Sequence, residues 1–364
     1  MFSPTDHAFM ARALRLAERG LYTTTPNPRV GCVIVRDGEI LGEGFHQRAG
    51  EPHAEIYALR HAGARARGAT VYVSLEPCSH HGRTPPCADA LVEAGVARVI
   101  AAMQDPNPSV AGQGLQRLRA AHIAAECGLC EAQARELNVG FVARMTRARP
   151  WLRIKTAASL DGRTALRNGQ SQWITGAAAR RDGHRWRARS CAVMVGVGTL
   201  LADNPRLTVR EVKTTRQPLR VVVDRQLEIP LDAHVLAEGH ALIATAEGRP
   251  EKVRQLEQLG AQVVRLPNAE GKVDLAALMR ELARRELNEV LVESGSRLNG
   301  ALLRAKIVDE LVVYLAPHLL GDTARGMFDL GELSTLDQRV PLTIRDVRRI
   351  GGDLRIVARL TRDS

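Results

Sequence analysis

The pattern His53-Ala54-Glu55, resumed further along the chain by Pro77-Cys78 and closed by Cys87, constrains this sequence more than any other feature. One imidazole and two thiols suit a zinc ion whose fourth position stays open to water. Zinc lowers the pKa of such a water towards neutrality, which prepares it for hydrolysis. Glu55 is not needed as a ligand, so it is free to move protons. The fold must therefore bring three separate segments to one point.

The arrangement H-x-E followed by P-C and a second Cys is typical of zinc-dependent deaminases. A structural zinc is the alternative interpretation, but such a site is closed by four protein ligands. Cys127 and Cys130 have thioredoxin-like spacing, yet no second ligand pair follows them, so we interpret them as incidental thiols. We therefore predict a catalytic zinc, with Glu55 as the proton shuttle.

The composition is that of an ordinary globular protein. The chain has 364 residues, of which 25% are charged and 45% hydrophobic, and about two domains are expected at this length. The net charge of +11 suggests an anionic partner such as nucleic acid, a membrane surface or a phosphorylated small molecule. An aromatic content of 3% argues against a stacking platform for single-stranded nucleic acid. The densest basic group is Arg180, Arg181, Arg185, Arg187 and Arg189.

We expect a reduced, cytoplasmic location. No apolar run is as long as the roughly 18 residues of a membrane span, so no membrane helix is predicted. The start Met1-Phe2-Ser3-Pro4 lacks the pattern of a secretory signal. Six cysteines in a chain of this length do not form a disulfide scaffold.

Strands and helices alternate in the first half of the chain. A helix is predicted from Ser3-Pro4, with Ser3 as its N-cap, to Gly20. Further predicted elements are strands over 30–35, 40–45, 71–75 and 96–101, a turn at 37–38, and helices that begin at 55 and 87. This order predicts a three-layer α/β domain with the metal between two helix starts.

Pro150 marks the predicted domain boundary, after a basic, helix-like stretch over 136–149. Beyond it, strands are predicted over 151–158, 191–197, 219–223 and 289–293. The turn Ser294-Gly295-Ser296 leads into a predicted helix over 298–303. Such a turn presents backbone N–H groups and a positive helix end to a phosphate. No G-x-G-x-x-G occurs, so a Rossmann fold is not supported.

A family resemblance rests on these motifs. The segments Pro26-Asn27-Pro28, His53-Ala54-Glu55 and Glu76-Pro77-Cys78-Ser79-His80-His81-Gly82-Arg83-Thr84-Pro85-Pro86-Cys87 resemble the bifunctional deaminase–reductase family of riboflavin biosynthesis. Other zinc deaminases usually have two residues between the cysteines, whereas this chain has eight. The second half resembles the reductase of that family through Lys155 with Ser159-Leu160-Asp161-Gly162-Arg163, Ser171-Gln172-Trp173-Ile174-Thr175, Gly196-x-Gly198-Thr199 with Leu201 to Arg210, and Glu293-Ser294-Gly295.

The resemblance implies an α/β chain of two domains. Residues 1–147 are expected to form a zinc-dependent pyrimidine deaminase with a cytidine-deaminase-like fold. Residues 150–364 are expected to form an NADPH-dependent reductase similar in fold to dihydrofolate reductase. The expected reactions are hydrolytic deamination of 2,5-diamino-6-(5-phosphoribosylamino)pyrimidin-4(3H)-one and reduction of the ribosyl side chain of 5-amino-6-(5-phosphoribosylamino)uracil to ribityl. The expected cofactors are Zn2+ and NADPH, and the expected partners are this phosphorylated pyrimidine and further copies of the chain, but no nucleic acid and no membrane.

The resemblance also implies site residues. His53, Cys78 and Cys87 bind zinc, Glu55 is catalytic, and Asn27 and Arg83 hold the deaminase substrate. The cofactor-binding residues of the reductase are Ala157, Trp173, Thr199, Asp203, Gly295, Ser296, Arg297, Leu298, Asn299, Gly300 and Ala301. Its substrate-binding residues are Ser171, Arg187, Leu207, Arg210 and Glu293.

Three assignments beyond the resemblance stay open. Arg225 follows Asp224 at a strand end and is expected to meet the extra phosphate of NADPH. Lys155 and Asp161 are candidates for proton delivery in the reductase. Two alternative functions stay open as well. One is a tRNA-editing deaminase or nucleic-acid binder, which the +11 charge favours. The other is a non-catalytic protein with a structural zinc.

Overall fold

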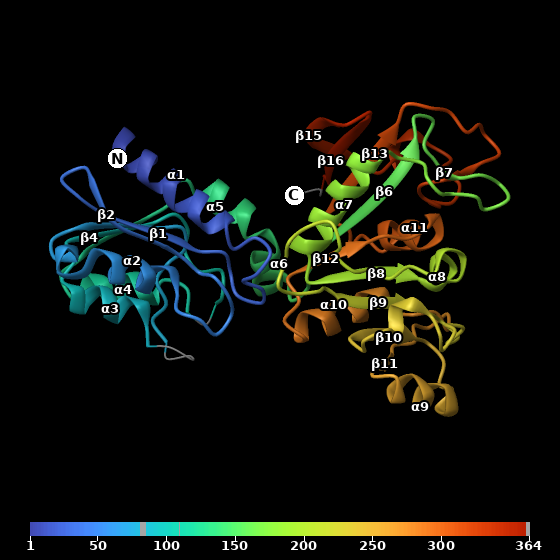
Figure 1. Cartoon of the computed structure of the whole chain (residues 1–364), viewed down its shortest axis with the longest axis horizontal. Helices are drawn as coiled ribbons and strands as arrows, with labels where there is room; N and C mark the ends of the chain where they lie inside the picture. Colours follow the sequence, from blue (N-terminus) through green and yellow to red (C-terminus); the bar gives the residue numbers. More distant parts are fainter. Residues whose placement is uncertain (81–84, 109, 362–364) are drawn as a thin grey trace. The chain divides into compact units, whose positions relative to one another are not determined.

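The chain folds as two compact units, Met1–Ala148 and Arg149–Ser364 (Figure 1). The computed structural model describes residues 1–80, 85–108 and 110–361. Each unit has its own sheet and its own hydrophobic core, as expected for domains of this size. Among the helices of the described part, none is long and apolar enough to cross a membrane.

Within the described residues, the first unit is built on a five-stranded sheet in the order β2-β1-β3-β4-β5. Strand β1 runs antiparallel to β2 and β3, whereas β3, β4 and β5 are parallel to one another. The strands are β1 (Gly31–Arg36), β2 (Glu39–Phe45), β3 (Thr70–Val73), β4 (Arg98–Ala101) and β5 (Ala124–Cys127). The helices are α1 (Pro4–Glu18), α2 (Ala54–Ala62), η1 (Gly63–Ala66), α3 (Cys87–Ala94), α4 (Gln113–Ala120), α5 (Glu131–Leu137) and α6 (Val139–Arg147).

Helix α1 begins where the sequence predicts. The Ser3 side chain accepts a hydrogen bond from Asp6 N at 3.1 Å, and the Asp6 carboxylate accepts one from Ser3 N at 2.8 Å. This reciprocal cap, with Pro4 at the first helical position, satisfies N–H groups that have no partner within the helix. The helix ends at Glu18, slightly before the predicted Gly20.

Glycines in β2 let helix α2 lie directly against the sheet. A Cβ atom on Gly44 would lie 2.3 Å from the carbonyl oxygen of Ala54, and one on Gly42 would lie 2.2 Å from that of Ala58. Strand glycines often mark such a close approach of another backbone. Because the first turn of α2 carries Glu55, the contact fixes how deeply that side chain enters the unit.

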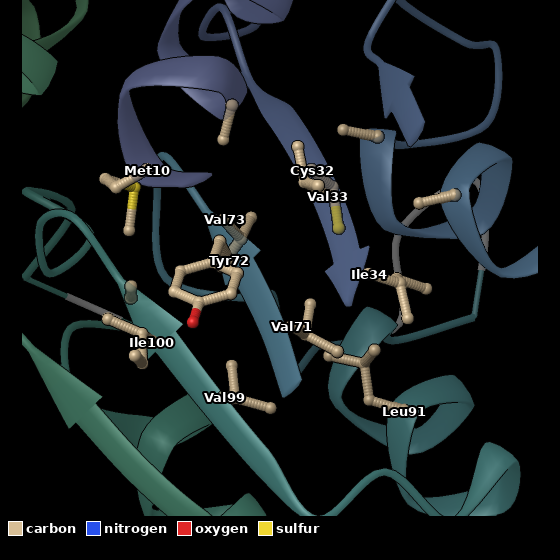
Figure 2. Packing of buried hydrophobic residues seen from close by; sticks show 14 of the residues in the cluster. Met10, Cys32, Val33, Ile34, Val71, Tyr72, Val73, Leu91, Val99 and Ile100 are labelled. Carbon is tan, nitrogen blue, oxygen red and sulfur yellow. The ribbon is translucent and has the colours of Figure 1, made fainter. Parts of the chain in front are cut away.

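The core of the first unit lies on both faces of its central strands (Figure 2). On β3, Tyr72 points towards Met10 of α1, whereas Val71 lies on the side of Leu91 of α3. Successive strand residues point to opposite faces, and Tyr72 also meets the Phe9 ring, with centroids 5.4 Å apart. Helices therefore cover both faces of the sheet, which is the predicted three-layer arrangement.

The single helix predicted over 136–149 is wrong: α5 and α6 are separate, with Asn138 between them. Asn138 Oδ1 accepts a hydrogen bond from Arg29 N at 2.7 Å, and its Nδ2 donates to Arg29 O at 2.9 Å. An asparagine engaged in this way offers the backbone an alternative to a continuous helix. The same two bonds hold this segment beside the approach to β1.

The second unit is built on a larger sheet in the order β11-β10-β9-β8-β12-β6-β13-β16-β15. All its strands from β11 to β13 are parallel, and β16 and β15 continue it in antiparallel fashion. The strands are β6 (Trp151–Ser159), β8 (Ala192–Gly196), β9 (Leu219–Val223), β10 (Ala241–Thr245), β11 (Gln262–Arg265), β12 (Glu289–Val292), β13 (Glu310–Ala316), β15 (Leu342–Ile350) and β16 (Asp353–Leu360), with β7 (Arg163–Ala165) and β14 (Arg325–Gly326) as a separate pair. The helices are α7 (Ala177–Arg189), α8 (Val197–Asp203), η2 (His234–Leu236), α9 (Pro250–Gln258), α10 (Leu275–Arg284), α11 (Ser296–Arg304) and η3 (Leu336–Gln338).

Apolar side chains fill both faces of this sheet. On β8, Met194 belongs to the cluster that contains Leu278 of α10, whereas Val195 belongs to the cluster that contains Leu256 of α9. Because parallel strands place their carboxyl ends at one edge of a sheet, the turns after β6, β8, β9 and β12 gather there. That edge is where the sequence places its candidate reductase residues.

Candidate active sites

His53, Cys78 and Cys87 come together in the first unit from three separate segments. His53 is the N-cap of α2, Cys87 is the first residue of α3, and Cys78 lies in the loop after β3. The Sγ atoms of Cys78 and Cys87 lie 3.6 and 3.4 Å from His53 Nδ1. All three ligand atoms lie within 4.8 Å of one another. Two of the three residues thus stand at helix starts, as the sequence predicts.

These distances fit a zinc ion. A Zn–S bond of about 2.3 Å and a Zn–N bond of about 2.05 Å at a tetrahedral angle place sulfur and nitrogen about 3.6 Å apart. The backbone also holds Cys78, whose Sγ accepts from Cys87 N at 3.3 Å and whose carbonyl oxygen accepts from Ala88 N at 3.1 Å. Hydrogen bonds with the Cys87 side chain, with His53 and with the Cys87 N–H lower the pKa of Cys78. The neighbouring Cys78 and burial raise the pKa of Cys87 in turn, so the pair holds one proton between its two sulfurs until a metal ion displaces it.

Glu55 lies beside the three ligands and is only 3% exposed. Burial raises the pKa of this carboxyl to about 7, close to the range that suits proton transfer at neutral pH. Its Oε2 atom is buried and has no hydrogen-bond partner among the described residues. A desolvated carboxylate oxygen in this position is available to take a proton from water and to deliver it to a leaving group.

His46 links Asn27 to the ligand cluster, a connection that sequence analysis missed. His46 Nε2 lies 3.0 Å from Asn27 Nδ2, and its Nδ1 lies 3.1 Å from Pro52 O. The His46 ring also meets the His53 ring edge-on, with centroids 5.2 Å apart. Asn27 therefore lies near the candidate metal site. A histidine directly after a strand is too common a pattern to mark His46 in advance.

Arg83, expected to hold the deaminase substrate, lies outside the described residues. Asp105, which follows β4, is a further acidic group near the site that sequence analysis did not single out. Burial raises the pKa of Asp105, and Glu76, His80 and Cys78 lie close enough to affect it electrostatically. The surrounding Asp-Pro-Asn-Pro pattern is that of a turn and carries no functional signal by itself.

The predicted cofactor residues of the second unit lie on elements that meet at the carboxyl edge of the sheet. Ala157 is on β6, Thr199 is in the first turn of α8, and Gly295 is the N-cap of α11. Thr199 Oγ1 accepts a hydrogen bond from Gly295 N at 3.0 Å, and Ser294 Oγ accepts one from Gly196 N at 3.0 Å. These bonds join the ends of β8 and β12 at the start of α11, where the helix N-terminus suits a phosphate.

Burial divides the segment 295–301, which was expected to wrap the cofactor phosphates. Gly295 and Arg297 are exposed, whereas Asn299 and Gly300 are buried. A Cβ atom on Gly300 would lie 1.8 Å from the carbonyl oxygen of Asp329, so this side of α11 packs against another segment of the unit. Asn299 Oδ1 is buried and has no partner among the described residues. Phosphate binding by this segment stays a prediction.

Ser171 and Asp203 are brought together, as their common expected site requires. The Asp203 carboxylate accepts hydrogen bonds from the side chains of Gln172 and Ser171. The neighbouring Trp173 ring is 69% exposed, and the Arg180 guanidinium lies 4.6 Å from its centroid. An exposed indole with a cation on one face can stack on a flat ring. This arrangement fits the expected contact with the nicotinamide.

Arg187 and Glu293, both expected to hold the reductase substrate, bind each other. Arg187 Nε and Nη2 donate to the two Glu293 oxygens at 2.6 and 2.9 Å, and Arg187 Nη1 donates to Thr208 O at 3.0 Å. Each side chain of the pair therefore already has a charged partner, and contact of either one with the substrate stays a prediction. Arg210 is exposed and is the better placed of the two arginines to reach a phosphate.

His184, one turn before Arg187 on α7, holds the segment that carries Leu207 and Arg210. Its Nδ1 accepts a hydrogen bond from Arg210 N at 3.3 Å. Burial, together with Arg187 and Arg210, lowers the pKa of His184 to about 4, so the ring is neutral and can accept this bond at pH 7. Leu207 is 2% exposed and has a φ of 55°. Sequence analysis missed His184.

Asp161 is not suited to proton delivery at neutral pH. Its carboxylate accepts hydrogen bonds from Ser159 Oγ and from Gly321 N, the latter at 2.8 Å, and these bonds lower its pKa to about 2. The group therefore anchors the ends of β6 and of the segment after β13. Arg225 follows β9 at the same sheet edge and is exposed, and its contact with the cofactor stays a prediction.

Comparison with known proteins explains why one chain carries two such sites. The cytidine and deoxycytidylate deaminase zinc-binding region matches residues 3–103, and the RibD C-terminal domain matches residues 150–356. The riboflavin biosynthesis protein RibD of Escherichia coli strain K12 is 50% identical over 366 residues, which cover 96% of this chain and 98% of that protein. The chain belongs to the RibD family.

Solved RibD structures share the whole fold. That of Acinetobacter baumannii RibD, form 1, is 44% identical with a TM-score of 0.93 and covers 98% of this chain and 99% of its own. A Thermotoga maritima structure, described as a diaminohydroxyphosphoribosylaminopyrimidine deaminase/5-amino-6-(5-phosphoribosylamino)uracil reductase, is 33% identical with a TM-score of 0.86 and covers 98% of this chain and 99% of its own.

Membership of the RibD family confirms the resemblance seen in the sequence and the fold class expected from it. The chain is a bifunctional enzyme of riboflavin biosynthesis, a deaminase and a reductase in one polypeptide. Its cofactors are zinc for the deaminase and NADPH for the reductase. The roles of individual residues in these two reactions stay predictions.

Proposed function

We propose that the two units catalyse consecutive steps. The first unit removes an exocyclic amine from 2,5-diamino-6-(5-phosphoribosylamino)pyrimidin-4(3H)-one. The second unit reduces the ribosyl side chain of 5-amino-6-(5-phosphoribosylamino)uracil to ribityl with NADPH. The observation that carries the proposal is the set of three ligand atoms within 4.8 Å of one another beside a carboxylate that is 3% exposed. The substrates are proposed from the description of the Thermotoga maritima relative.

In the first unit, His53, Cys78 and Cys87 would hold the zinc ion. Zinc with three protein ligands and one open position lowers the pKa of water and so supplies a nucleophile at neutral pH. Glu55 takes a proton from the attacking water and passes it to the departing nitrogen. A C–O bond forms, the C–N bond breaks and ammonia leaves. Asn27, held through His46, would orient the pyrimidine.

In the second unit, Trp173, Thr199 and the start of α11 would hold NADPH, while Glu293 and Arg210 would hold the substrate. NADPH would supply a hydride to the ribose carbon that bears the amine. The bond from that carbon to the ring oxygen would break, and a proton would go to that oxygen, which leaves the open ribityl chain. Lys155 suits the role of proton donor because burial lowers its pKa, and Glu293 and Arg187 lie near it. The protein positions the cofactor and the substrate. Both are anionic, so the net charge of +11 attracts them.

Supplying the diamino substrate with and without NADPH tests the proposal. Without NADPH, we expect ammonia and a product in which oxygen replaces one nitrogen. With NADPH, we expect a product with two further hydrogens, and one NADPH consumed for each ammonia released. Mass spectrometry of the products decides between these outcomes. A wild-type enzyme that binds zinc but releases no ammonia from this substrate would refute the deaminase assignment.

A fragment that spans residues 149–364 tests the assignment of the reductase to the second unit. It contains a complete sheet and its own core clusters, so we expect it to fold, to bind NADPH and to reduce the deaminated product. A folded fragment that does not bind NADPH would contradict this assignment.

The net charge of +11 favours one other function, deamination of nucleic acid. Ammonia release from tRNA, measured beside release from the pyrimidine phosphate, separates the two. We expect release from the pyrimidine alone, because the described residues offer few exposed aromatic rings for stacking on bases.

We further propose that the enzyme is cytoplasmic and self-associates through β15. This edge strand exposes Leu342 at 44%, Ile344 at 62% and Val347 at 54% beside charged residues, and an edge strand presents unpaired backbone N–H and C=O groups to another chain. All six cysteines are free thiols, as expected in a reducing compartment. Light scattering of the wild type and of Ile344→Glu tests self-association: we expect the substitution to reduce the mass to that of a single chain.

A further inference from the structure

Glu76 is a buried carboxylate that the chemistry above does not use. It is 5% exposed and directly precedes the Pro77-Cys78 segment. Each of its oxygens accepts hydrogen bonds from two backbone N–H groups. Oε2 accepts from Asp105 and Gly112 at 3.0 and 2.9 Å, and Oε1 accepts from Gly114 and Leu115 at 2.9 and 3.1 Å. We propose that Glu76 is a positioning residue for the zinc ligand Cys78, an inference that rests on the ligand assignment proposed above.

The positions of the four donors show that Glu76 takes the role of an N-cap side chain for helix α4. Helix α4 begins after Gly112, which has no side chain and so cannot cap the helix. The N–H groups of Gly114 and Leu115, at the second and third helical positions, are those that an N-cap side chain normally satisfies. Glu76 therefore caps α4 from a different part of the chain, and through Asp105 it also holds the loop after β4. Bonds from an anionic acceptor to backbone N–H groups are among the stronger ones in proteins.

The capped end of α4 packs directly against Pro77, the residue before the zinc ligand Cys78. A Cβ atom on Gly114 would lie 1.9 Å from the carbonyl oxygen of Pro77, so the first turn of α4 touches Pro77 directly. On its other side, Cys78 is held by the N–H groups of Cys87 and Ala88 at the start of α3. Cys78 is thus fixed between two helix starts, and the Glu76 carboxylate secures one of them.

Glu76→Gln in the full-length enzyme tests the proposal. An amide replaces one acceptor oxygen with an NH2 group, so two of the four backbone N–H groups lose their partner. Substituting a residue that holds a metal ligand in place typically lowers the metal affinity by about 10–100-fold. We expect a zinc chelator to remove the metal from this variant at least about tenfold more readily than from wild type. In the cobalt-substituted enzyme, we expect the thiolate–metal absorption bands to shift because the Cys78 sulfur moves.

Asp6→Asn is the matched control. Asp6 belongs to the same unit, is also 5% exposed, and accepts hydrogen bonds from Ser3 N and Tyr72 OH, both at 2.8 Å, and from Arg98 at 3.0 Å. It lies on α1, away from the segment that carries Cys78. We expect this substitution to lower the thermal stability of the first unit while the cobalt bands and zinc competition stay as in wild type. NADPH binding checks in each variant that the second unit is folded.

Glu76→Asp keeps the charge, but its shorter side chain moves the carboxylate away from the four N–H groups. This variant replaces Glu76→Gln in the experiment if the glutamine variant does not fold. We expect a smaller change in the same direction. Unaltered zinc competition and cobalt bands in the folded Glu76 variants would overturn the proposal, and so would equal changes in Asp6→Asn. A wild-type enzyme that binds no stoichiometric zinc would instead refute the ligand assignment itself.

Discussion

Replacing Arg187 by methionine tests whether one buried ion pair stabilises the second unit. Arg187 binds both oxygens of Glu293 at 2.6 and 2.9 Å, and the two side chains are only 14% and 15% exposed. Removing one member of such a pair leaves the other charge desolvated, which typically costs about 3–5 kcal/mol. We expect the free energy of unfolding of the second unit to fall by an amount at the lower end of this range.

The pKa of Glu293 gives a second way to judge how much free energy of unfolding this ion pair contributes. Burial raises this pKa, but Arg187 and then Lys155 outweigh burial and bring it from 4.5 to about 2. A difference of this size corresponds to about 3 kcal/mol. Because the folded-state pKa lies below the unfolded value, the stabilisation is complete above about pH 4.5 and is lost as the pH falls towards 2. The deficit of Arg187→Met should therefore be full at pH 7 and smaller at about pH 3.

Chemical unfolding of the full-length enzyme at these two pH values measures the effect. The transition of the second unit is the one that NADPH shifts, since a ligand stabilises the unit that binds it. The double variant Arg187→Met/Glu293→Gln should recover part of the loss, because it leaves no unpaired carboxylate, although Lys155 loses the Glu293 charge beside it. A deficit below about 1 kcal/mol at pH 7, the size typical of exposed pairs, would refute the reasoning, as would a deficit that does not shrink in acid.

Three further predictions concern the sites. Glu55→Gln should keep its zinc, measured by metal analysis, while deamination falls by about 10²–10⁴-fold; retained activity would contradict the proton-shuttle role. His184→Leu should raise the KM for the reductase substrate with little change in kcat or in NADPH affinity, because it frees the backbone of Arg210, whereas His184→Asn keeps an acceptor and should stay near wild type. Gly300→Ala should destabilise the second unit by about 1–3 kcal/mol, because its Cβ would lie 1.8 Å from Asp329 O, and NADPH affinity should fall with it in a binding titration.

Short-range patterns account for what could be predicted. The start of α1 follows from Ser3, Pro4 and Asp6, which act within one turn. The candidate zinc site follows from residue types whose chemistry dictates a common position, so His53 and Cys87 could be assigned without knowledge of the sheet. Asn138 shows the limit of this reasoning: it interrupts the predicted helix because it bonds to Arg29, a partner 109 residues away in sequence.

Arg153 shows why the remaining contacts could not be predicted. It is 1% exposed, between the buried Leu152 and Ile154, and it pairs with Glu289 at 3.1 Å and with Glu310. A buried charge must be paired, so the sequence indicates that partners exist, but these lie 136 and 157 residues further along the chain. They reach Arg153 only because β12 and β13 flank β6 in the sheet. An order that moved either strand away would remove one of the two carboxylates that hold Arg153, so this network favours the observed topology over its alternatives.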